Sequence, residues 1–246
     1  MSTPARKTVK ARAVTVRMYN VGFGDAFLVE IPAADRPRRM LFDCGSISSG
    51  GAPISAVVRR IIADATDADG KARIDVVVAT HRHRDHVSGF SDKAWDRVEV
   101  QEVWMPWTED YADPQATRIR EAQCRLAAAL DQGIRRKLAL RGLGAAARAG
   151  LSATATMVSN SLTNENEMKT LHDGFAGNPK RRYLPGKQPG HDTVQTPALP
   201  GVTAYIMGPS RDEAVIRDMD PPEGGGYLRL AASAGGSADG APEPFR

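Results

Sequence analysis

The chain has 246 residues, 41% of them hydrophobic and 25% charged, which is enough for one large domain with a sizeable core. The formal charge of +4 permits an anionic substrate or nucleic acid without requiring either. Only two cysteines occur, Cys44 and Cys124, so a small disulfide-bonded scaffold is excluded. With no export signal and no run of about eighteen apolar residues, we expect a cytoplasmic protein that does not enter a membrane.

The first half of the chain has the pattern of a sheet. Apolar residues alternate with polar ones over residues 13–18, the period of a half-buried strand. The continuous run Val76-Val77-Val78 is typical of a strand covered on both faces. We predict strands at Ala13–Met18, Ala26–Ile31, Met40–Phe42, Ile74–Ala79 and Val98–Met105, and an amphipathic helix at Ile54–Ile62.

The second half changes character. Residues 113–148 are rich in Ala, Leu, Arg and Gln, and they predict one or two helices. We predict a further helix at Glu165–Phe175, one clear strand at Val202–Met207 and a short helix at Arg211–Met219. Residues 1–11 and 231–246 are expected to be disordered. We therefore expect one domain at residues 12–230. It consists of a first half at 12–107, a helical segment at 113–175 and the single late strand at 202–207.

The chemistry-bearing segment is Thr80-His81-Arg82-His83-Arg84-Asp85-His86, directly after the buried-strand pattern. In an extended chain His81 and His83 project to the same side and can hold one ion. Beyond the bend, Asp85 and His86 can address a second ion. Two neighbouring ions would activate a shared water as a nucleophile. The alternative is a set of solvated surface histidines.

Several neighbours of this segment are expected to play no direct part in chemistry. Arg82 and Arg84 should point away from the ions into solvent; the alternative is that they raise the local potential for a phosphate or carboxylate substrate. His172 lies in a helical pattern and is expected to be partly exposed. We expect the three tryptophans to pack in the core rather than line a cleft: Trp95, Trp104 and Trp107.

The segment resembles the HxHxDH signature of the metallo-β-lactamase superfamily. Asn20-Val21-Gly22-Phe23-Gly24-Asp25-Ala26 is similar to a turn in the branch related to the competence protein ComEC, and Leu41-Phe42-Asp43-Cys44-Gly45 is similar to the next strand end of that branch. The resemblance covers residues 13–107, and beyond them only Met207-Gly208-Pro209 is similar.

This resemblance implies an α/β fold of the αββα sandwich type that holds one or two metal ions, usually zinc, with manganese or iron as alternatives. It implies a hydrolase with His81, His83, Asp85 and His86 as ligands, in which Asp85 also orients the nucleophile. Asp43 would accept hydrogen bonds that orient the metal loops; an ordinary turn aspartate is the alternative. By analogy the substrate is a small molecule, a phosphodiester or nucleic acid, and redox chemistry at iron is a further alternative.

The later ligands of such a site are not found. A bridging aspartate is missing, and His191 is only a weak candidate for the late histidine. One late strand against five early ones indicates an incomplete sandwich, so we expect a truncated chain that binds metal weakly and catalyses poorly. The alternative is a non-catalytic metal-binding or interaction module, with residues 113–148 as its partner surface.

Overall fold

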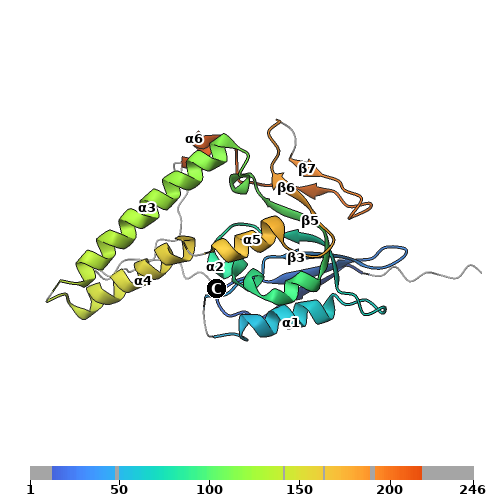
Figure 1. Ribbon diagram of the computed structural model, residues 1–246, viewed down its shortest axis with the longest axis horizontal. Helices are drawn as coiled ribbons and strands as arrows, with labels where there is room; N and C mark the ends of the chain where they lie inside the picture. Colours follow the sequence, from blue (N-terminus) through green and yellow to red (C-terminus); the bar gives the residue numbers. More distant parts are fainter. Residues whose placement is uncertain (1–12, 48–49, 141, 163, 189–191, 218–246) are drawn as a thin grey trace, which may run out of the picture. The chain divides into compact units, whose positions relative to one another are not determined.

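A six-stranded mixed sheet forms the centre of the fold, in the order β1-β2-β3-β4-β5-β6 (Figure 1). The structure, a computed structural model, describes residues 13–47, 50–140, 142–162, 164–188 and 192–217. Strands β1 to β3 are antiparallel, and β3 to β6 are parallel. Their bounds are β1 Thr15–Met18, β2 Phe27–Ile31, β3 Arg38–Phe42, β4 Arg73–Val78, β5 Glu99–Pro106 and β6 Lys180–Leu184.

Helices cover one face of this sheet. Helix α1 (Ile54–Asp64) makes the parallel connection from β3 to β4, and α5 (Glu165–Asp173) packs on the same core. Short helices α2 (Arg84–Val87), η1 (Ser88–Ser91) and η2 (Lys93–Arg97) follow β4, and η3 (Trp107–Glu109) follows β5. The layered α/β class and the helical segment after the first sheet were therefore predicted correctly.

A small second sheet covers part of the opposite face. It consists of β7 (Thr193–Val194) and β8 (Ala204–Tyr205), paired antiparallel. Buried apolar side chains from the main sheet and from the segment around β7 pack together here in a second hydrophobic core. They are Met40, Val76, Trp104, Val194, Ala198 and Leu199. Farther along the main sheet, Val16 and Met18 of β1 are 63% and 72% exposed. Among the described residues the second layer is thus limited to two strands.

Three strands follow residue 107 in the described part of the chain, where the sequence pattern indicates only one. Strand β6 escapes detection because its sequence begins Lys-Arg-Arg and has no apolar alternation. One of its charges is paired after folding: Arg182 lies 2.6 Å from the buried Glu102 of β5. Strand β7 has two residues, too few for any periodicity.

Helices α3 (Pro114–Leu138) and α4 (Ala145–Leu162) form a hairpin that projects from the sheet (Figure 1). Asp113 caps α3, since its carboxylate accepts a hydrogen bond from the Gln115 amide at 2.9 Å. Only Ala116, Arg120 and Ile134 of α3 are buried. None of the described helices is long and apolar enough to cross a membrane. Residues 210–217, which include α6 (Glu213–Arg217), belong to a unit separate from residues 13–209.

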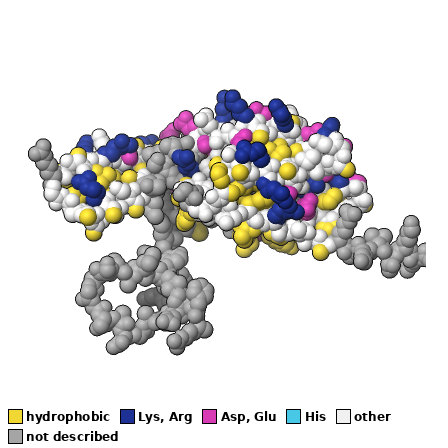
Figure 2. Space-filling view, turned by 90° about the horizontal axis from the view of Figure 1, so that it is seen from below, with side chains coloured by type: hydrophobic (Ala, Val, Ile, Leu, Met, Phe, Trp, Pro, Cys, Tyr) yellow, Lys and Arg dark blue, Asp and Glu magenta, His cyan; other side chains and the backbone are white. Residues whose placement is uncertain are grey.

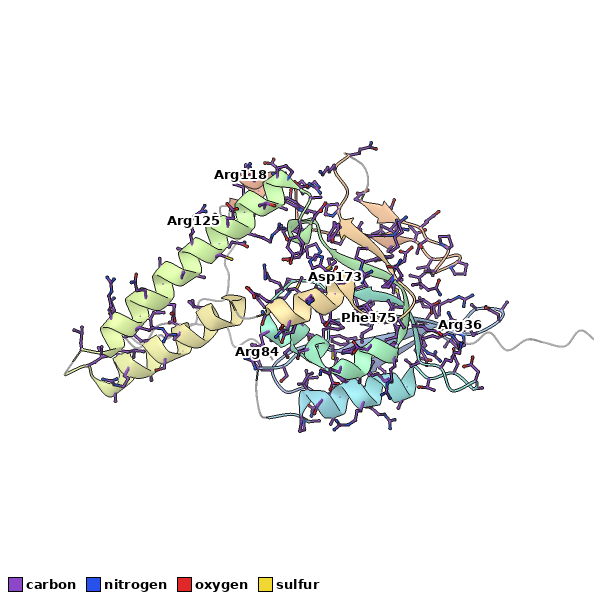
Figure 3. The ribbon with its side chains drawn as sticks, in the orientation of Figure 1. Arg36, Arg84, Arg118, Arg125, Asp173 and Phe175 are labelled. Atoms are coloured by element: carbon purple, nitrogen blue, oxygen red, sulfur yellow. The ribbon has the colours of Figure 1, made fainter. Side chains whose placement is uncertain are left out.

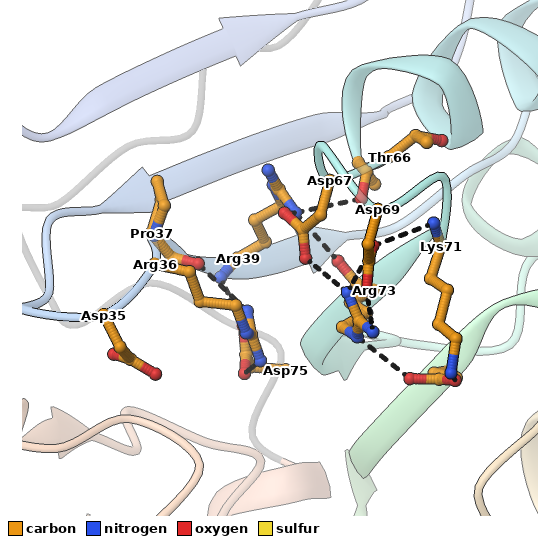
Figure 4. A network of polar contacts seen from close by, with 12 residues as sticks. Asp35, Arg36, Pro37, Arg39, Thr66, Asp67, Asp69, Lys71, Arg73 and Asp75 are labelled. Atoms are coloured by element: carbon orange, nitrogen blue, oxygen red, sulfur yellow. Dashed lines mark hydrogen bonds and ion pairs between the residues drawn. The ribbon is translucent and has the colours of Figure 1, made fainter.

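A network of arginines and aspartates stabilises one end of the main sheet (Figure 4). Asp75 is fully buried, and its oxygens accept hydrogen bonds from both terminal nitrogens of Arg36, at 2.6 and 3.0 Å. They also accept hydrogen bonds from the Arg39 amide at 2.8 Å and from Gln101 at 2.6 Å. A buried carboxylate is tolerated only with such partners, so this network is structural.

Candidate metal centre

The histidine segment lies where β4 gives way to α2. His83 is the N-cap of α2 and has an extended backbone, with φ −68° and ψ 148°. A bend lies at Arg82, and the helix begins at Arg84, so that Asp85 and His86 lie within α2. The helical turn after His83 agrees with the prediction, whereas the bend at Arg82 differs from the extended course expected between His81 and His83.

Three of the four predicted ligands form a compact group. Ligand atoms of His81, Asp85 and His86 all lie within 4.8 Å of one another. The ring centroids of His81 and His86 are 3.8 Å apart. His83 stands outside this group, although its ring centroid lies 4.7 Å from that of His81. The structure thus associates His81 with Asp85 and His86, whereas a separate pair of His81 and His83 remains a prediction.

The two ring nitrogens of His86 face different carboxylates. Nδ1 lies 2.9 Å from Asp43 and 3.4 Å from Asp25, while Nε2 lies 3.5 Å from Asp85. The hydrogen bond to Asp43 raises the pKa of His86 above its usual value. An Nδ1–H donated to Asp43 leaves Nε2 as the lone-pair nitrogen, directed toward Asp85.

Asp43 links several parts of the site. It is buried, and its oxygens accept hydrogen bonds from the Thr80 amide at 2.7 Å and from the Thr80 hydroxyl at 2.6 Å. Its φ of 54° is a left-handed conformation that aspartate tolerates better than most residues. The predicted hydrogen bonds of Asp43 to the motif loop are therefore present.

Backbone contacts from the two N-terminal motifs hold Asp85 and His86 in place. The Asp25 amide donates to the Asp85 carbonyl at 3.1 Å, and the Cys44 amide donates to the His86 carbonyl at 2.8 Å. A Cβ on Gly45 would lie 2.5 Å from backbone atoms of Asp85 and His86, closer than any real contact. Gly45 is thus required for the close approach of this strand end to the backbone of the motif.

The donor set suits a divalent transition metal. Imidazole nitrogens and a carboxylate oxygen are the ligands that zinc and its neighbours prefer. Burial lowers the pKa of His81 and of His83, which keeps both rings neutral and able to offer a lone pair near neutral pH. The ligand atoms of a second group, Asp25, Asp43 and His86, also lie within 4.8 Å of one another. This group shares His86, whose Nδ1 is already hydrogen-bonded to Asp43.

Two predictions about neighbouring side chains are wrong. Arg82 is not solvated: it is 23% exposed and lies 3.8 Å from Glu109. His172 is buried rather than partly exposed, and its Nδ1 lies 3.0 Å from the Tyr183 hydroxyl. Both errors have one cause, because the burying partners come from segments distant in sequence. Arg84 is exposed, as predicted.

Glu109 carries no signal in the sequence that would mark it as a candidate site residue. Burial raises the pKa of its carboxyl group, and its Oε2 has no hydrogen-bond partner among the described residues. It follows Trp107 in η3 and belongs to no motif. The three tryptophans Trp95, Trp104 and Trp107 are buried, as predicted.

A pocket of about 480 Å³ lies beside the motif loop. Its lining includes Arg82, Tyr111, Arg120, Lys169 and His172, contributed by the motif loop, α3, α5 and the segment between η3 and α3. The Tyr111 ring stacks on His172 with centroids 4.3 Å apart. The pocket therefore connects the metal motif to the helical part of the chain.

The expected late ligands are not brought to the site within the described part of the chain. Both candidate groups draw only on residues between 25 and 86. His191, the weak candidate for the late histidine, lies outside the described residues. Comparisons with protein-family models, curated proteins and solved structures found no match for this chain. What is shown is a mixed α/β protein with a candidate His/Asp metal cluster.

Proposed function

We propose that this protein is a metal-dependent hydrolase. The observation that carries the proposal is the convergence of His81, Asp85 and His86 within 4.8 Å at the end of a buried parallel strand. Strand ends of α/β sheets are common positions for catalytic groups. The buried Asp43 behind His86 supports the same reading, because metal-binding histidines usually donate their second nitrogen to a carboxylate.

Each residue has a distinct task in this proposal. His81, His83, Asp85 and His86 hold one or two ions, with zinc as the first candidate and manganese or iron as alternatives. A bound divalent cation lowers the pKa of water enough to supply a hydroxide nucleophile near neutral pH. Asp85 also accepts a hydrogen bond from that nucleophile and orients it. Asp43 fixes the ring of His86.

A phosphodiester is the proposed substrate class. The resemblance of the N-terminal motifs to the ComEC-related branch supports it by analogy. The pocket next to the motif is lined by three cationic groups, Arg82, Arg120 and Lys169, and by three carboxylates, Glu121, Glu165 and Asp173, so the substrate class rests on the analogy and not on the charge of the pocket.

The test is hydrolysis of bis-p-nitrophenyl phosphate after loading with zinc or manganese. We expect Asp85→Asn to lower the rate at least about tenfold relative to the wild type, because it removes a charged ligand and the orienting group. Asp96→Asn, an exposed carboxylate in η2, is the matched control and should retain the wild-type rate. Equal rates for wild type, Asp85→Asn and a metal-free sample would refute the proposal.

A second candidate is a non-catalytic metal-binding module. The restriction of both ligand groups to residues 25–86 favours it, since a hydrolytic site needs a fuller set of ligands. Metal uptake without any turnover by the loaded protein would support this candidate over the hydrolase.

A further inference from the structure

Arg82 of the motif loop is held by two residues from the second half of the chain. Its backbone carbonyl accepts a hydrogen bond from Nδ2 of Asn164, and its guanidinium lies 3.8 Å from a carboxylate oxygen of Glu109. Arg82 stands between His81 and His83, two of the four candidate ligands. Any movement of Arg82 therefore moves the backbone that carries both histidines.

Arg120 of α3 fixes the backbone that carries Glu109. Its guanidinium donates hydrogen bonds to the carbonyls of Thr108 and Asp110, the residues on either side of Glu109. Arg120 is only 9% exposed, so these bonds form away from solvent. Glu109 itself is 3% exposed, and its carboxyl group has little freedom to turn away from Arg82.

The burial of Arg120 sets it apart from other basic residues of α3. Figure 3 shows Arg118 and Arg125 on the side of α3 that faces away from α4, and both are exposed. Figure 2 likewise shows Lys and Arg side chains on the surface of the α3–α4 hairpin. Arg120 instead directs its guanidinium to the backbone at the end of η3. The link from α3 to the motif loop therefore runs through the buried side of the helix and not through its charged surface.

Asn164 connects the motif loop to the helices that follow the hairpin loop. It is the N-cap residue of α5 and is 1% exposed. Helix α4 contacts α2, and α5 contacts η1, the short helix that follows α2. The metal loop thus lies against both α4 and α5, and Asn164 supplies a hydrogen bond at this contact.

The charges of Arg82 and Glu109 depend on each other because both groups are largely buried. Nε of Arg82 and Oε2 of Glu109 have no hydrogen-bond partner among the described residues. The attraction between the two side chains is therefore what offsets the cost of burying them. Removing one of them would leave the other charge buried without its partner, which is strongly unfavourable.

We propose that Glu109 and Asn164 are positioning residues of the metal centre, which hold Arg82, and through it His81 and His83, in the conformation that binds the ion. The inference rests on the proposed function, whereas the contacts that carry it need no metal. Neither residue touches the ion, and both act through Arg82. The second half of the chain thereby takes part in the metal centre without supplying a ligand among the described residues.

The first experiment measures hydrogen exchange of the full chain in EDTA, by mass spectrometry of peptides that cover residues 80–87. Glu109→Gln removes the charge and Asn164→Asp removes the amide donor, and both keep the size of the side chain. We expect exchange in these peptides to be at least about threefold faster in both variants, since the loop opens more readily. The matched control is Glu102→Gln, another buried carboxylate, which pairs with Arg182. It should leave exchange at residues 80–87 at the wild-type rate.

The second experiment is a zinc titration of the same proteins by calorimetry. Glu109→Gln and Asn164→Asp should bind zinc about 3- to 30-fold more weakly than the wild type, whereas Glu102→Gln should bind like the wild type. Arg82→Gln should show a similar loss. The double variant Arg82→Gln/Glu109→Gln should lose no more than either single variant, because both changes break one contact.

Unchanged exchange at residues 80–87 in both positioning variants would overturn the inference. Equal zinc losses in Glu102→Gln, or additive losses in the double variant, would overturn it as well, because the effects would then reflect general destabilisation. No zinc uptake by the wild type would instead refute the proposed function. The exchange measurement in EDTA would still decide whether Glu109 and Asn164 hold the loop.

Discussion

The Nδ1 atom of His86 lies 2.9 Å from a carboxylate oxygen of Asp43, although 43 positions separate the two residues in the chain. The ends of the parallel strands β3 and β4 are neighbours in the sheet, and this is what brings the two residues together. The same carboxylate accepts two hydrogen bonds from Thr80. Asp43 therefore forms hydrogen bonds with both Thr80, the first residue of the motif, and His86, its last histidine.

Replacement of Asp43 should weaken metal binding without removing a proposed ligand. In Asp43→Asn the side chain loses its charge and one acceptor, so His86 is less well oriented and its nitrogen less basic. We expect a loss of about 10- to 100-fold in zinc affinity, measured by calorimetric titration. Asp96→Asn should bind like the wild type. An Asp43→Asn variant with unchanged affinity would show that the contact has no role in the metal site.

Gly45 should be a position where a single methyl group damages the fold. A Cβ there would lie 2.5 Å from the backbone of Asp85 and His86, which the Cys44 amide holds in place. We expect Gly45→Ala to lower the free energy of unfolding in urea by about 2 kcal/mol or more.

Gly133 of α3 offers the matched control for this change. A Cβ at Gly133 meets no atom within 4 Å, and alanine is the better helix former by about 1 kcal/mol. Gly133→Ala should therefore be neutral or stabilising. A Gly45→Ala protein as stable as Gly133→Ala would contradict the close approach at the metal motif.

The buried ring of His172 should make stability depend on pH. Burial lowers the pKa of His172 to about 4, and the nearby guanidinium groups of Arg120 and Arg181 act in the same direction, against Asp173. The unfolded chain takes up the proton at its ordinary pKa near 6.5, before the folded chain does. Stability is therefore lost as pH falls from about 6.5 to about 4, by up to about 3 kcal/mol.

Urea denaturation at several pH values measures this loss. In His172→Gln the difference from the wild type should widen toward neutral pH and shrink toward pH 4, since glutamine does not titrate. Parallel pH profiles for the two proteins would rule out His172 as the titrating group.

Much of the fold follows from local sequence signals. The apolar run at Val76-Val77-Val78 predicts the central strand, and the spacing of apolar residues predicts α1, because both patterns report which faces are buried. The helical turn after His83 is equally local. For the same reason the four candidate ligands can be identified from the amino-acid sequence alone.

The features that local signals do not predict depend on contacts between distant segments. The strand character of β6 depends on Glu102, which pairs with Arg182 across the sheet. The burial of Arg82 depends on Glu109, and that of His172 on Tyr111 and Tyr183. The association of His81 with Asp85 and His86, rather than with His83 alone, depends on how α2 turns. Such contacts between distant segments leave no periodic pattern of apolar residues in the sequence.

The most direct measurement of the central claim is a metal titration of the purified chain, with zinc, manganese and ferrous iron compared by calorimetry. The account predicts uptake of at least one ion per chain, with affinity weaker than nanomolar because the ligand groups found among the described residues lie within residues 25–86. It also predicts a loss of at least about tenfold in both His81→Ala and Asp85→Ala. No uptake of any of the three metals by the wild type, or equal uptake by both variants, would contradict it.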